Sequence, residues 1–240
     1  MSFFTFRDGR LFCESVPVSR IAERHGTPCY LYSAASFRGR YGQLREAFAD
    51  FAPLICYSVK SNSNLSILRL LAAEGAGFDV VSGGEIFRVL KAGAPAEKIV
   101  YAGVAKTDGE IRYALNAGIH MFNCESQAEA RNIERIASEM NKPARLALRI
   151  NPDVDAKTHA KTTTGKKETK FGISPRRALV LVEEARQWQS ARITGIHLHL
   201  GSPIYSTEPY ELALERMQSF IPQCRECGAR IDTLNIGGGY

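Results

Sequence analysis

A lysine and two histidines stand at the ends of apolar runs typical of β-strands. Lys60 follows the run at 54–59, and a partly desolvated amine there is less basic and more nucleophilic than one in water. Active sites of β/α barrels lie at the C-terminal ends of the strands, so this position predicts a Schiff-base lysine. The alternative is a lysine whose stem packs at the rim while its amine stays in water.

The two histidines, His197 and His199, belong to the run at 193–200, and their spacing places both side chains on one side of a strand. Three interpretations remain open. The pair could bind zinc in a barrel hydrolase, or a flat imidazole followed by Gly201-Ser202 could stack on an aromatic cofactor and bind its phosphate. The third is a buried histidine with ordinary hydrogen bonds.

Charged residues inside other apolar runs also indicate a site. Asp79 lies in the run at 78–81 and Arg149 in the run at 145–150, where a charge is costly unless it is paired or functional. The triplet Gly237–Gly239 follows the last apolar run, and successive glycine N–H groups suit a phosphate. We therefore expect these residues to meet Lys60 and His199 at one end of the strands.

Short apolar runs alternate with amphipathic stretches from about residue 54 onward, which indicates a parallel α/β fold. The first strands begin about 21 to 23 residues apart, which leaves room for one helix each and favours a closed β/α barrel. A complete barrel has eight strands, and we count seven, so we expect a barrel truncated by one strand. The seven runs lie at 54–59, 78–81, 98–103, 120–123, 145–150, 193–200 and 232–236.

Helix starts are marked by local signals. Ser82, Thr107 and Ser126 each precede a glutamate by three residues, the pattern of a capping box. Asn64 and Ser174-Pro175 predict two further helix starts.

The N-terminal segment differs from the rest. Asp8-Gly9 lies between alternating apolar residues of 4–12, which predicts a β-hairpin. A lone hairpin is marginally stable in water, so we expect it to pair with a sheet that this chain does not visibly contain. We divide the chain into a hairpin and lead-in segment at 1–35 and an incomplete barrel at 36–240.

The net charge of +6 over 240 residues is concentrated in one segment. Five lysines against one glutamate at 157–170 account for four of the six charges, so we expect no nucleic-acid partner. This polar segment predicts a long loop, either a lid over an anionic ligand or a solvated surface. No apolar run is long enough to span a membrane and no signal peptide is evident, so we expect a cytoplasmic protein.

The six cysteines are scattered through the chain, which favours reduced thiols over a disulfide framework. Cys224-x-x-Cys227 could be half of a zinc site, but no second pair accompanies it, so we expect no bound metal.

Six motifs together resemble the pyridoxal-phosphate-dependent decarboxylases of the alanine-racemase-like fold, most closely the diaminopimelate decarboxylases. They occur in the family's order over nearly the whole chain. They are YSVKSN at 57–62, FDVVSGGE at 78–85, LRINPDVD at 148–155, THAKTTTGKKETKFGI at 158–173, HLHLGS at 197–202 and LNIGGGY at 234–240.

The resemblance implies a pyridoxal 5'-phosphate site with assigned residues. Lys60 would form the Schiff base with the cofactor, and His199 would stack on its pyridine ring. Asp79 and Arg149 would support the site from within. The phosphate would be held by Ser202 and the backbone of Gly237, Gly238 and Gly239.

The implied activity is decarboxylation of meso-diaminopimelate to L-lysine and CO₂. Family segments that complete the site, including a glutamate for the pyridine nitrogen and a C-terminal β-domain, would follow Tyr240, so we expect an incomplete part of a longer, homodimeric decarboxylase. The alternatives are a non-catalytic pyridoxal-phosphate-binding barrel and a decarboxylase of a related amino acid.

Overall fold

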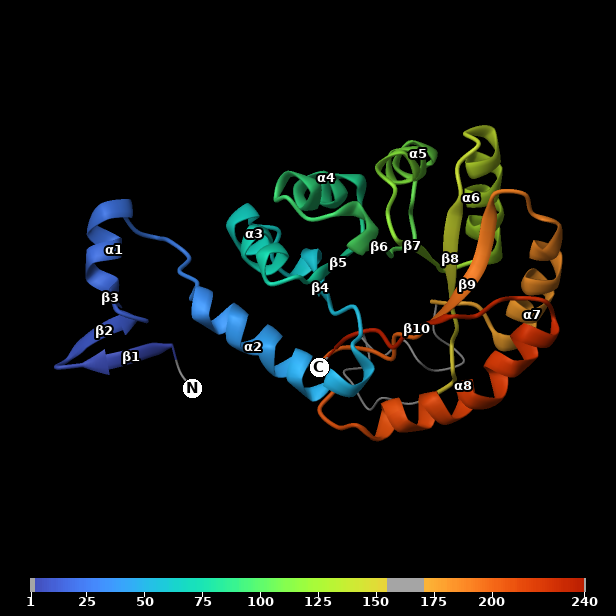
Figure 1. Cartoon of the computed structure of the whole chain (residues 1–240). Coiled ribbons are helices and arrows are strands. Elements are labelled where there is room, and N and C mark those ends of the chain that lie inside the picture. Colours follow the sequence, from blue (N-terminus) through green and yellow to red (C-terminus); the bar gives the residue numbers. More distant parts are fainter. Residues whose placement is uncertain (1–2, 155–170, 240) are drawn as a thin grey trace.

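The computed structural model describes residues 3–154 and 171–239, and its largest element is a seven-stranded parallel sheet. The strands pair in chain order from β4 to β10. Figure 1 shows them curving into part of a barrel with helices outside. This confirms the predicted seven-stranded β/α barrel. The strands are β4 (Cys56–Ser58), β5 (Gly77–Val80), β6 (Ile99–Tyr101), β7 (Met121–Cys124), β8 (Ala144–Arg149), β9 (Ala191–His197) and β10 (Thr233–Asn235).

One α-helix follows each strand from β4 to β9, as the spacing of the runs predicts. These helices are α3 (Leu65–Ala73), α4 (Gly83–Lys91), α5 (Asp108–Ala117), α6 (Gln127–Glu139), α7 (Pro175–Glu184) and α8 (Glu208–Glu226), and α2 (Ala34–Ala47) precedes β4. Single 3-10 turns lie at Ala49–Phe51, Val59–Ser61, Ala96–Lys98 and Ala185–Gln187. Within the described residues, none of the helices has the length and apolar character needed to cross a membrane.

The N-terminal segment forms a separate small sheet. β1 (Phe4–Arg7) and β2 (Arg10–Cys13) are the predicted hairpin, and Asp8 and Gly9 have φ of 48° and 73°, as a two-residue hairpin turn requires. A third strand, β3 (Val16–Pro17), which the sequence did not predict, pairs with β2 and extends the hairpin to a three-stranded sheet. Helix α1 (Val18–His25) follows, and Figure 1 shows this unit at the end of α2 away from the barrel strands.

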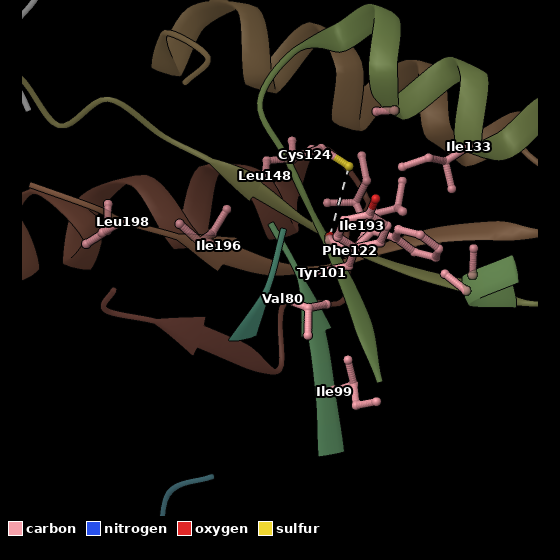
Figure 2. Close-up of a cluster of buried hydrophobic side chains, with 14 of the residues drawn as sticks. Val80, Ile99, Tyr101, Phe122, Cys124, Ile133, Leu148, Ile193, Ile196 and Leu198 are labelled. Atoms are coloured by element: carbon pink, nitrogen blue, oxygen red, sulfur yellow. Dashed lines mark hydrogen bonds between the residues drawn. The ribbon is translucent and has the colours of Figure 1, made fainter. Parts of the chain in front are cut away.

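The core lies mainly between the sheet and its surrounding helices. Every second residue of a strand points outward into this core. Phe78, Tyr101, Phe122 and Leu148 are among these residues and are almost fully buried. Figure 2 shows this cluster. A second, much smaller apolar cluster of Val100, Met121 and Ala147, with Cys56 against it, lies on the opposite face of the same strands.

A serine or threonine side chain caps each of the three predicted helix starts, but the complete capping box forms at one of them. Thr107 and its glutamate form a complete capping box. At Ser82 and Ser126 only half of the box forms, because Glu85 and Glu129 accept hydrogen bonds from the N–H groups of the preceding residues, Val81 and Glu125. The strand-to-helix turn is therefore fixed one residue earlier than a capping box would place it. Asn64 and Ser174 also stand at helix starts, although the Ser174 side chain does not cap.

Candidate functional site

Lys60 lies just beyond the C-terminal end of β4, in the single turn Val59–Ser61. Its side chain is exposed, so the partial desolvation expected of it does not occur in this structure. Its charge reaches the inner residues nonetheless, because it acts on the pKa values of Asp79, His197 and His199. Lys60 therefore stands at the C-terminal end of the barrel strands, near enough to Asp79, His197 and His199 for its charge to act on them.

Asp79 projects from β5 toward the inner face, where it is paired in register with Ser58 of β4. The Ser58 hydroxyl donates a hydrogen bond of 3.2 Å to the Asp79 carboxylate. Burial raises the pKa of Asp79 to about 6, against the opposing effects of the Lys60 charge and the Ser58 hydrogen bond. An ionised Asp79 is thus available at neutral pH to attract a cation at the position of Lys60.

The two histidines lie next to each other at the end of β9 and differ in burial. His197 is 6% exposed and its Nδ1 atom has no hydrogen-bond partner among the described residues. Burial lowers the pKa of His199 to about 4, and the charges of Arg149 and Lys60 add to this effect. Burial also lowers the pKa of His197. Both imidazoles are therefore neutral near pH 7, which suits stacking of a ring against an aromatic group.

Arg149 ends β8 and is paired, as a buried charge must be. Its Nη1 donates a hydrogen bond of 2.7 Å to Oε1 of Glu125, and the two side chains are only 9% and 8% exposed. Its Nη2 donates to the His199 carbonyl oxygen at 3.4 Å, and its guanidinium lies 5.2 Å from the centre of the Phe171 ring. Sequence reasoning missed Glu125, because a charged residue between a strand and the start of the next helix is ordinary and only the contact with Arg149 distinguishes it.

The glycine triplet packs directly against the loop that follows β9. A Cβ atom on Gly237 would lie 2.3 Å from the Leu198 carbonyl oxygen, and one on Gly239 would lie 2.2 Å from that of Gly201. Both glycines also have positive φ. The triplet is therefore held next to His199 and to the exposed Ser202 by contacts that only glycine allows.

Neighbouring side chains fix the shape of this glycine turn. Asn235 of β10 accepts a hydrogen bond from the Gly237 N–H at 2.9 Å, and the Tyr210 hydroxyl donates to the Gly238 carbonyl oxygen at 3.0 Å. Neither residue was singled out from the sequence. Because the Gly237 N–H is already bonded, an anion at this turn would meet the N–H groups of Gly238 and Gly239 instead.

Lys106 carries a further buried charge at this end of the sheet. It follows β6, and its Nζ donates to the Glu129 carboxylate at 2.5 Å and to two carbonyl oxygens, those of Gly103 and Asn123. The side chain is 1% exposed. Every hydrogen of the ammonium thus has a partner, so Lys106 ties the β6–α5 loop to β7 and is unavailable as a nucleophile.

A cleft of about 800 Å³ lies beside this group rather than within it. Its lining includes Glu125, Asn151, Phe171, Arg177 and Arg216, but neither Lys60 nor His199. Glu125 and Phe171 line the cleft and also contact Arg149 of the site. The predicted polar loop at 157–170 lies outside the described residues.

Metal binding gains no geometric support. Over residues 3–154 and 171–239, no three His, Cys, Asp or Glu side chains are grouped so that they could hold a metal ion. Cys224 is buried in α8 and Cys227 forms its C-cap, and both thiols are free.

These features define a class of protein. A lysine amine, a neutral imidazole and a glycine turn at the rim of a β/α barrel are typical of a domain that binds a phosphorylated aldehyde cofactor, namely pyridoxal phosphate. Gly237 and Gly239 pack closely against 198–201, whereas a Cβ on Gly238 would meet no atom within 4 Å, so the turn has room for an anion at Gly238 and the residues present fit this cofactor.

Comparison with known proteins gives the family. The family described as pyridoxal-dependent decarboxylase, pyridoxal binding domain, matches residues 34–240, and the chain belongs to it. The chain is 44% identical over 239 residues to the diaminopimelate decarboxylase of Pseudomonas aeruginosa, covering 100% of this chain and 58% of that protein.

Solved structures agree with this assignment. The Helicobacter pylori diaminopimelate decarboxylase in complex with L-lysine is 38% identical with a TM-score of 0.87, and 93% of this chain matches 58% of that chain. The M. jannaschii diaminopimelate decarboxylase in complex with L-lysine is 35% identical with a TM-score of 0.90, with coverage of 98% and 56%. The barrel fold of the alanine-racemase type implied by the sequence is thus confirmed. The chain spans somewhat more than half the length of these relatives.

Proposed function

We propose that this chain is the cofactor-binding barrel of a diaminopimelate decarboxylase, which converts meso-diaminopimelate to L-lysine and CO₂. The observation that carries this proposal is the 44% identity to a curated enzyme of that activity across the whole chain. The arrangement of Lys60, Asp79 and His199 around one mouth of the barrel supports it.

Each predicted site residue has a role in this proposal. Lys60 provides the amine that binds the cofactor covalently, and ionised Asp79 stabilises the positive charge that the lysine carries. The neutral ring of His199 packs on the cofactor ring. Ser202 donates its hydroxyl to the phosphate, together with the glycine turn.

Within the turn, the N–H groups of Gly238 and Gly239 would hold the phosphate, and Gly237 shapes the turn by its hydrogen bond to Asn235. Arg149 supports His199 by donating a hydrogen bond to its carbonyl oxygen. Bound pyridoxal phosphate supplies the electron sink that makes loss of the α-carboxylate feasible, and the chain supplies orientation and a fixed electrostatic environment.

The proposal extends to the rest of the protein. We assign residues 1–35 as a hairpin and lead-in segment and residues 36–240 as the barrel. The exposed aromatic side chains of the small sheet, Phe4 and Phe6, suit packing against a further β-domain such as the family carries. We also propose a cytoplasmic homodimer that acts on a free amino acid, with no membrane or nucleic-acid partner.

Activity measurements test the assignment. A protein that carries this barrel together with the C-terminal β-domain of the family, loaded with pyridoxal phosphate, should release CO₂ from meso-diaminopimelate. Lys60→Ala should abolish this release, because it removes the amine proposed to bind the cofactor. Lys91→Ala, an exposed lysine on α4, is the matched control and should retain activity. Release of CO₂ from L-ornithine or L-arginine but not from meso-diaminopimelate would show that the proposed substrate is wrong. Cofactor binding without any release of CO₂ would favour a non-catalytic cofactor carrier.

A further inference from the structure

Two segments of the barrel repeat one another in sequence and structure. Residues 78–85, FDVVSGGE, and residues 122–129, FNCESQAE, share phenylalanine, serine and glutamate at the same spacing. Each segment contains the end of a strand and the start of the following helix, β5 with α4 and β7 with α6. The repeat allows each residue to be compared with a counterpart in the same local structure.

The backbone bonds of the two copies are the same. Ser82 accepts from the Glu85 N–H at 3.2 Å, and Ser126 accepts from the Glu129 N–H at 3.1 Å. Each glutamate in turn accepts from the N–H of the last residue before its serine, at 2.9 Å in both copies. That last residue therefore serves the turn through its backbone alone.

The side chain at this position differs between the copies. It is Val81 in the first and Glu125 in the second, so the turn does not need a carboxylate there. Glu125 instead directs its carboxylate to Arg149 on the neighbouring strand, in a contact that is almost fully buried. Burying this charge is costly, so a requirement other than the strand-to-helix turn must be met by it.

Arg149 carries the effect of Glu125 onward. One guanidinium nitrogen is held by Glu125, another donates to the His199 carbonyl oxygen, and the group lies over the Phe171 ring. Without Glu125 the guanidinium would be a buried charge with no acid partner, and it would move toward water or another acceptor. The support at the His199 backbone would then be lost.

We propose that Glu125 is a positioning residue of the cofactor site. It fixes Arg149, and through Arg149 it fixes the orientation of the His199 ring against bound pyridoxal phosphate. This inference rests on the proposed function, because it assigns to that site a residue that does not itself touch the cofactor. A merely structural ion pair would alter stability without altering the orientation of the bound cofactor.

The visible circular dichroism of protein-bound pyridoxal phosphate provides the test, since it reports how the cofactor is held. Wild type and Glu125→Gln are titrated with pyridoxal phosphate. We expect about tenfold weaker binding in the variant, from loss of a buried charge-assisted hydrogen bond, and a changed dichroic band at saturation. Glu184→Gln, which removes an arginine–carboxylate pair with Arg131 on the helical surface, is the matched control and should leave both unchanged.

Two further variants complete the test. Glu125→Asp keeps the charge and should fold and restore most of the wild-type band. Combined with Arg149→Met, Glu125→Gln should add nothing to the effect of Arg149→Met alone, because Glu125 acts through Arg149.

A wild-type band and affinity at saturation in Glu125→Gln would overturn the positioning role alone. If the Gln variant does not fold, a wild-type band and affinity in the folded Arg149→Met variant would overturn it, because the role depends on Arg149. Failure of the wild type to bind pyridoxal phosphate would overturn the proposed function, and this role with it.

Discussion

The two faces of the barrel sheet contrast in what they carry. The outer face is large and apolar, and side chains such as Phe78, Tyr101 and Phe122 are sealed against the helices. The inner face has a small apolar cluster and, toward the strand ends, the polar residues Asp79 and His197. Because successive residues of a strand point to opposite faces, one short run encodes both.

Within the part of the chain that the structure describes, buried polar atoms without a hydrogen-bond partner are concentrated near the inner face. Seven buried side-chain atoms of the described residues lack a hydrogen-bond partner, and four of them belong to Asn123, Glu125 and His197. Buried polar groups normally have partners, so these four atoms make the inner face near the strand ends suitable for a polar ligand. The packing of the outer face thus stabilises the fold, whereas the inner face keeps polar groups that lower the stability but can act on a ligand.

Substitutions of two neighbouring residues on β7 should give the largest difference in stability between the two faces. Phe122→Ala should lower the free energy of unfolding by about 3–5 kcal/mol, because a fully buried ring that packs 6.0 Å from Tyr101 is replaced by a cavity. Asn123→Ala, on the inner face, should cost no more than about 1 kcal/mol, since its side-chain atoms have no hydrogen bond to lose. Denaturant unfolding measures both, and equal losses would contradict the division between the faces.

Asp79→Asn should sharpen the comparison with a smaller effect of opposite sign. Burial raises the pKa of Asp79 from 3.8 to about 6, so the folded state binds the proton more tightly than the unfolded state. The free energy of unfolding of the wild type should therefore fall as the pH rises from about 4 to about 6 and stay low above that. Asparagine cannot ionise, so the variant should be more stable at pH 7 by roughly 2–3 kcal/mol.

Unfolding of both proteins without cofactor at pH 4, 5, 6 and 7 provides the measurement. The two curves should separate as the pH rises. A constant difference over this range would show that ionisation of Asp79 carries no such cost.

The repeated β/α pattern could be predicted from the sequence because its signals are local. Seven apolar runs, the Asp8-Gly9 turn and the helix starts at Asn64 and Thr107 each depend on a few adjacent residues, and the structure confirms them. Strand β3 was missed because it is two residues long and contains Pro17, which breaks the usual pattern of a strand.

The site was only partly predictable, for a different reason. Asp79, Arg149 and His199 stand out because a charged or titratable residue in an apolar run is unusual, and Lys60 stands out as a lysine directly after such a run. Glu125 follows its run and precedes a helix, where a charged residue is ordinary, and only its pairing with Arg149 across two strands gives it a role. Such contacts depend on the three-dimensional register of the sheet, which the spacing along the chain does not specify.

The central claim is that Lys60 is the amine to which pyridoxal phosphate binds. The direct measurement is reduction of the protein–cofactor complex with sodium borohydride, followed by digestion and mass spectrometry of the peptides. The account predicts one modified lysine, Lys60, and no modification of buried Lys106. A cofactor adduct on Lys106 or on any other lysine in place of Lys60, or no adduct at all, would contradict it.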